Sequence, residues 1–105
     1  MKEIDAYQLK AMRDAGEDFE LIDVREPHEY EIANLGGRLI PKAEIGAYAD
    51  ELPRDKKVII HCRTGGRSGI VVQQLEAEHG FDNLYNLRGG ILAYADHIDP
   101  SLTKY

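Results

Sequence analysis

The chain has 105 residues, of which 43% are hydrophobic and 30% are charged, and its formal net charge is −6. This length predicts one domain over residues 1–105 that can bury a core without disulfides. The composition disfavours the disordered and membrane-spanning classes, and the acidic charge disfavours nucleic acid as a partner. Because charged residues are spread through the first 18 positions, there is no apolar core for a signal peptide, and we expect a cytoplasmic protein without membrane contact.

The first half of the chain predicts helices and strands in alternation. Asp5 is a good cap for a helix that begins at Ala6, and Gly16 is well placed just after its end. An apolar run predicts a strand that ends near Val24. Further along we expect a helical turn or structured loop over 26–31, a short strand at 39–40 closed by Pro41, and a helix over 43–52 stopped by Pro53.

The second half is organised around a short β-branched run, Val58–Ile60, which predicts a buried strand. The only cysteine, Cys62, comes just after it, and a helix over 67–79 follows in spite of three consecutive β-branched residues. A strand over 84–87 and a helix over 91–97 complete the series. Alternation of this kind predicts an α/β fold with a mostly parallel sheet covered by helices on both faces.

Residues that can carry chemistry follow three of the predicted strands. Asp23 and Arg25 mark the end of one, Cys62 follows the central strand, and the segment 88–90 follows the last. In parallel sheets, binding sites collect outside the carboxyl ends of the strands. The three strand ends therefore predict a site that includes Cys62.

The loop after Cys62 suits a reactive thiolate. It contains Arg63, Thr64, Gly65, Gly66 and Arg67. A thiolate is the reactive form of cysteine, and backbone N–H groups at a helix start favour its negative charge. Two flanking arginines add positive charge, and the glycines let the amides point inward. We expect this loop to bind an anionic donor such as thiosulfate, or to stabilise a persulfide.

Simpler interpretations stand beside this one. A lone cysteine after an apolar strand is more often a small buried hydrophobe than a nucleophile, and only the loop shifts the balance toward catalysis. His61 is better explained as a packed or hydrogen-bonded residue than as a general base. Asp23 and Arg25 fit a structural ion pair, and Ser68 a polar residue in the first helical turn. The histidines show no ligand spacing, so neither a metal nor a cofactor is expected.

Four segments together resemble the rhodanese-like (sulfurtransferase) superfamily. They are LIDVR at 21–25, LIP at 39–41, HCRTGGRS at 61–68 and LRGGI at 87–91. The resemblance implies a five-stranded parallel sheet, and a reaction in which Cys62 takes up a sulfane sulfur and passes it to a nucleophile. It also implies that residues 63–67 form the anion and persulfide cradle, while Asp23, Arg25, Glu29 and Ser68 support the structure around it.

Two segments narrow the resemblance. NLGGRLIP at 34–41 and IDPSL at 98–102 are similar to the rhodanese domain at the C-terminus of E1-like adenylating enzymes. This similarity implies a sulfur-carrier or adenylating protein as a partner. The chain departs from the family in lacking the histidine that usually precedes the Ile-Pro segment, and in having Tyr94 where tryptophan is common.

Two other functions stay open from the sequence. Cysteine phosphatases and arsenate reductases in the same superfamily use a C-x5-R loop, whereas Cys62 and Arg67 here form C-x4-R, a smaller ring that suits sulfur better. The other alternative is a non-catalytic interaction module of a larger system. Because the chain has a single cysteine, an internal cysteine pair is excluded, and any sulfur acceptor must be another molecule.

Overall fold

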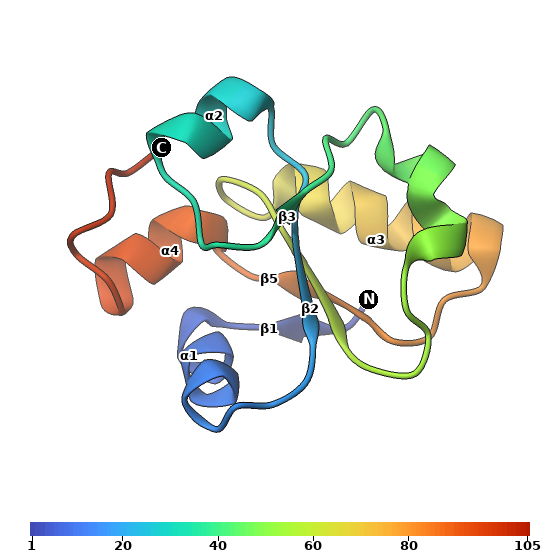
Figure 1. Ribbon diagram of the computed structural model, residues 1–105, viewed down its shortest axis with the longest axis horizontal. Helices are drawn as coiled ribbons and strands as arrows, with labels where there is room; N and C mark the ends of the chain where they lie inside the picture. The colour runs from blue at the N-terminus through green and yellow to red at the C-terminus, as the bar shows by residue number, and fades with distance from the viewer.

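The computed structural model describes residues 1–105 and has a five-stranded sheet in the order β1-β5-β4-β2-β3, with every pairing parallel. Helices cover both faces of the sheet (Figure 1). The strands are β1 (Glu3–Ile4), β2 (Glu20–Asp23), β3 (Arg38–Leu39), β4 (Val58–His61) and β5 (Leu84–Leu87). The helices are α1 (Ala6–Asp14), α2 (Pro27–Ile32), the 3₁₀ helix η1 (Ile45–Glu51), α3 (Gly66–His79) and α4 (Gly90–His97).

The central strand β4 is buried along its whole length and divides the core into two clusters. Val58, Ile60 and Cys62 face the cluster formed with α3 and η1, and Ile59 faces the cluster formed with α1 and α4. This alternation follows from the two-residue period of a strand. It directs Cys62 toward α3 and sends His61 to the opposite face.

The structure confirms the expected α/β class and five parallel strands, but several elements differ from the residue patterns. Strand β1 has no counterpart in the apolar pattern, because two residues are too few to show a period. It exists because Asn86 and Arg88 of the β5 segment donate backbone hydrogen bonds to Lys2 and Ile4 at 3.0 and 2.8 Å. The short strand expected at 39–40 lies one residue earlier.

The segment expected as an α-helix over 43–52 is instead a 3₁₀ helix. Its hydrogen bonds join residues three apart, as in the bond from Ala47 to Glu44 at 3.0 Å. Prolines bracket the segment and it contains Gly46, so there is little room or propensity for a regular α-helix. The predicted helical face is still buried, because Ile45, Ala49 and Leu52 all point into the core.

The remaining helices agree with the patterns. Asp5 caps α1 by accepting a hydrogen bond from the Gln8 N–H at 2.8 Å, as its position predicts. In α3 the β-branched residues Val71 and Val72 are fully buried, so tertiary packing outweighs their weak helix propensity. None of the helices has both the length and the apolar character needed to cross a membrane.

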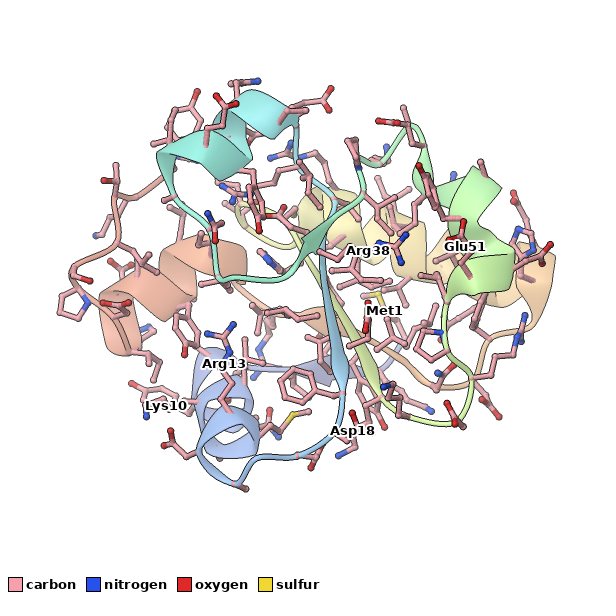
Figure 2. All side chains as sticks on the ribbon, in the orientation of Figure 1. Met1, Lys10, Arg13, Asp18, Arg38 and Glu51 are labelled. Atoms are coloured by element: carbon pink, nitrogen blue, oxygen red, sulfur yellow. The ribbon has the colours of Figure 1, made fainter.

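Arg13 links α1 to the segment that follows α2, and Figure 2 labels its side chain on α1. Its guanidinium donates to the Leu35 carbonyl and lies 5.5 Å from the centre of the Tyr94 ring. A cation over an aromatic face is attractive. The tyrosine at this position is therefore packed in the core beneath a cation, and the departure from tryptophan leaves no exposed aromatic ring.

Candidate active site

Cys62 follows the last residue of β4, and its side chain is only 1% exposed. The loop 63–65 then turns the chain into α3, which begins at Gly66. The sulfur therefore lies at the carboxyl end of the central strand and beside a helix N-terminus. Both locations were expected from the order of strand, cysteine and glycine loop.

The loop depends on two glycines, both with positive φ, and one of them also makes a close approach. Gly65 has φ +107°, a left-handed conformation that side chains rarely adopt. Gly90, at the start of α4, has φ +59°, and a Cβ there would lie 2.4 Å from the Arg63 carbonyl oxygen and 2.6 Å from that of Cys62. The last strand end thus packs directly against the cysteine loop. Gly66, by contrast, has no positive φ and opens the helix in an ordinary conformation.

Three donors are directed at the sulfur. The Gly65 backbone N–H donates to Cys62 Sγ at 3.1 Å, the Ser68 N–H lies at 3.5 Å, and the Ser68 hydroxyl lies at 3.3 Å. Donors of this kind stabilise a thiolate more than a thiol, because the charged acceptor makes the stronger hydrogen bond. The geometry therefore favours negative charge at this atom.

The pKa of Cys62 reflects two opposing effects. Burial raises the pKa of the thiol, and it is the largest single cause. Hydrogen bonds from the Ser68 hydroxyl and from the backbone N–H groups of Ser68, Gly65 and Thr64 together outweigh it, so the pKa lies below its usual value. A lowered pKa increases the fraction of reactive thiolate near neutral pH.

One of the two arginines of the loop is paired with a carboxylate. Arg67 donates from Nη1 and Nη2 to both carboxylate oxygens of Glu29, at 2.7 and 2.9 Å, and neither contacts the sulfur. Arg63 and Thr64 are exposed at the outer side of the loop. The sequence predicted stabilisation of the thiolate by backbone amides and by arginine charge, and the donors at the sulfur are backbone amides and the Ser68 hydroxyl. Because Glu29 neutralises the charge of Arg67, Arg63 is the unpaired cation of the loop.

A second set of buried polar groups lies under the site. Arg25 and Asp23 are both fully buried and form a forked ion pair, with Arg25 Nη2 2.8 Å from Asp23 Oδ2. The same Nη2 donates to the Ala33 carbonyl at 2.6 Å. His61 is also fully buried, and burial lowers its pKa to about 4, so the imidazole is neutral at pH 7. These contacts join β2, β4 and the end of α2.

The sequence did not identify the roles of two residues in the site, one that contacts the sulfur and one that contacts its neighbours. Ser68 was assigned only a structural role, but its hydroxyl contacts Cys62 and also lies 2.5 Å from Asn86 Oδ1. Asn86, in β5, was not identified at all. The sequence feature that could have identified Asn86 is a polar residue among the apolar residues of a short predicted strand, at a position where a buried residue is usually apolar.

A hollow of about 340 Å³ opens beside the loop. It is lined by Val24, Glu26, Lys42, Ala43, Arg67 and Gln74. Because Lys42 and Glu26 both line it, the hollow offers both signs of charge next to the Arg67 end of the loop. No group of three His, Cys, Asp or Glu side chains is arranged to hold a metal ion.

The chain is similar to a protein family and to several known proteins. Residues 5–97 match the family model described as Rhodanese-like domain. The chain is 36% identical over 101 residues to a protein of Allochromatium vinosum named Sulfurtransferase, covering 95% of this chain and 94% of that protein. A crystal structure of a rhodanese-like domain protein from Staphylococcus aureus has a TM-score of 0.83 and 30% identity, and the match covers 93% of this chain and 95% of that one.

Longer relatives contain a similar segment. The chain is 36% identical over 101 residues to the probable adenylyltransferase/sulfurtransferase MoeZ of Mycobacterium tuberculosis, covering 93% of this chain but only 26% of that protein. The chain spans less than a third of the length of several curated relatives that it matches. The relatives of the chain thus include a protein named as an adenylyltransferase/sulfurtransferase, in line with the resemblance to the rhodanese domain of adenylating enzymes.

Proposed function

Since this chain belongs to the rhodanese-like domain family, we propose that it is a sulfurtransferase that carries sulfane sulfur as a persulfide on Cys62. The observation that carries the proposal is the set of donors at the sulfur. The Gly65 N–H at 3.1 Å and the Ser68 hydroxyl at 3.3 Å both stabilise the thiolate that must attack. The relatives named as sulfurtransferases support the same reaction class.

The proposed loading step is a displacement at sulfur. The Cys62 thiolate attacks the outer sulfur of thiosulfate, a new S–S bond forms, and the sulfur–sulfonate bond breaks so that sulfite leaves with the electron pair. The amides that held the thiolate then surround the persulfide. The exposed Arg63 at the outer side of the loop suits an anionic donor.

The proposed unloading step needs another molecule. A thiolate on the acceptor attacks the outer persulfide sulfur, the bond to Sγ breaks, and Cys62 leaves as the thiolate that began the cycle. Because the chain has no second cysteine, it cannot resolve the persulfide internally. The similarity to a segment of MoeZ supports a sulfur-carrier or adenylating protein as the acceptor system.

Intact-mass measurement tests the proposal directly. After incubation with thiosulfate and removal of the excess, we expect the mass of one added sulfur atom, and we expect Cys62→Ala to show no gain. Treatment with cyanide should remove the added sulfur and release thiocyanate. A folded protein that gains no sulfur from thiosulfate or from a low-molecular-weight persulfide would overturn the proposal.

The alternative of a phosphatase is tested with the same protein. The C-x4-R loop is one residue shorter than the loop that surrounds a phosphate, so we expect no turnover of an aryl phosphate. Turnover that disappears in Cys62→Ser would instead favour the phosphatase. Binding of a partner that is unaffected by Cys62→Ala, together with no sulfur uptake, would identify an interaction module.

A further inference from the structure

The hydroxyl of Ser68 lies between two acceptors. Its Oγ is 2.5 Å from Asn86 Oδ1 and 3.3 Å from Cys62 Sγ. All three side chains are buried, with exposures of 0% for Ser68, 3% for Asn86 and 1% for Cys62. Water therefore cannot readily replace either partner, and a serine hydroxyl has only one proton to donate.

The orientation of the Asn86 amide is fixed by its other contacts. Nδ2 lies 3.2 Å from the Gly65 carbonyl oxygen and 3.4 Å from Glu3 Oε2, and both of these atoms are acceptors. The amide nitrogen must face them, which turns the amide oxygen toward Ser68. Asn86 thus presents an acceptor to the hydroxyl and a donor to the loop.

With Cys62 as a thiol, every group in this row is satisfied. The S–H can donate to Ser68 Oγ, and the Ser68 O–H can donate to Asn86 Oδ1 at the shorter of the two distances. When the thiol loses its proton, the thiolate becomes an acceptor that the Ser68 O–H can satisfy only by turning away from Asn86. Asn86 and the thiolate therefore compete for one proton.

We propose that Asn86 is a positioning residue that competes with Cys62 for the proton of the Ser68 hydroxyl and so limits how strongly the thiolate is stabilised. The inference deepens the proposed function, because the same competition ends when Sγ becomes the inner, uncharged sulfur of a persulfide. The Ser68 hydroxyl then donates its hydrogen bond to Asn86 again. The Ser68–Asn86 hydrogen bond thus favours Cys62 in its persulfide form over the free thiolate.

The charges around Cys62 bear on any test by pH. Arg67 of α3 is neutralised by Glu29 of α2, and the buried pair of Asp23 and Arg25 lies under β4. The remaining groups are the neutral His61, the exposed Arg63, and Glu3 of β1 beyond Asn86. Of these groups only Glu3 contacts Asn86, so the effect of a change at Asn86 on the thiol is measured in a Glu3→Gln background, where that contact carries no charge.

Alkylation of Cys62 by iodoacetamide, followed over a range of pH, reports the thiol pKa without any sulfur donor. In Asn86→Ala the hydroxyl loses its competing acceptor and turns to Sγ, so we expect a lower pKa and about tenfold more thiolate below that pKa. In Asn86→Asp the carboxylate binds the hydroxyl more strongly and repels the thiolate, so we expect a higher pKa. In the Ser68→Ala background, Asn86→Ala should have no effect.

Opposite shifts in the two Asn86 variants, together with the loss of the Ala effect without Ser68, support the proposal. Shifts of the same sign, or an unchanged Ala effect in Ser68→Ala, would overturn it in favour of a packing role. If Asn86→Ala does not fold, Asn86→Ser serves the same purpose, because its hydroxyl is too short to reach Ser68. Sulfur uptake is measured separately, so its absence would reject the proposed function without deciding the alkylation result.

Discussion

Arg67 and Glu29 form a forked ion pair that ties the first turn of α3 to α2. Both guanidinium Nη atoms donate to the carboxylate, at 2.7 and 2.9 Å, and Glu29 Oε1 also accepts from the Glu26 N–H at 3.0 Å. The hydrogen bond from Arg67 is the largest cause that lowers the pKa of Glu29 to about 2. The pair therefore joins α2 to the start of α3, and neither hydrogen bond is directed at the sulfur.

The first prediction concerns this pair. Glu29→Gln should lower the free energy of unfolding by about 1 kcal/mol, because the fork geometry is good but Arg67 is partly exposed to solvent. The carboxylate contribution is fully present above pH 4.5 and is lost as the pH falls toward about 2. Urea unfolding at several pH values measures it. The exposed Glu31→Gln is the control, and an equal effect of both changes would contradict the prediction.

The second prediction uses two glycines. Gly90→Ala should destabilise the protein by about 3 kcal/mol or more, since it combines a left-handed φ of +59° with a Cβ 2.4 Å from the Arg63 carbonyl. Gly46→Ala should be neutral or slightly stabilising, because its Cβ meets nothing within 4 Å. Thermal unfolding compares the two. Equal melting temperatures for both variants would show that the loop can move away from Gly90 at little cost.

The sequence predicted those parts of the fold that have a local cause. The apolar run at 58–60, the cap at Asp5 and the left-handed glycine at position 16 are each readable from neighbouring residues. Strand β1 is not, because Glu3 and Ile4 become a strand only when β5 lies beside them. The 3₁₀ form of η1 likewise depends on how the segment between two prolines fits the core.

The same distinction applies to the site. Cys62 and its loop form one continuous stretch, so their proximity is encoded locally. Asn86 reaches Ser68 only because β5 is the neighbour of β4 in the sheet. The pairing of Arg67 with Glu29 also joins separate helices, and without it the sequence suggested that Arg67 acts on the sulfur. The role of each residue, as a donor to the sulfur or as a support for the loop, therefore depends on contacts between segments that are distant in the chain.

The third prediction contrasts a buried ion pair with an exposed one. Asp23→Asn leaves Arg25 charged and fully buried without a counterion, so we expect a loss of about 3 kcal/mol in the free energy of unfolding. Asp14→Asn removes the partner of Lys10 on the surface of α1, where both side chains are exposed to solvent and we expect a much smaller loss. Urea unfolding at pH 7 gives both values. Similar losses would mean that Arg25 finds another partner or reaches water.

The last prediction follows from His61. Burial lowers its pKa from 6.5 to about 4, so the unfolded chain takes up a proton in a range of pH where the folded protein does not. The stability that depends on neutral His61 is complete above pH 6.5 and falls as the pH drops to about 4, by a total of about 3 kcal/mol.

In His61→Phe, which cannot take up a proton, the free energy of unfolding should fall much less between pH 7 and pH 4. His28→Gln, at an exposed position, should retain the slope of the original protein. Parallel slopes for His61→Phe and the original protein would show that His61 is protonated in the folded state, and that its charge is then balanced by Asp23, 3.8 Å from Nε2.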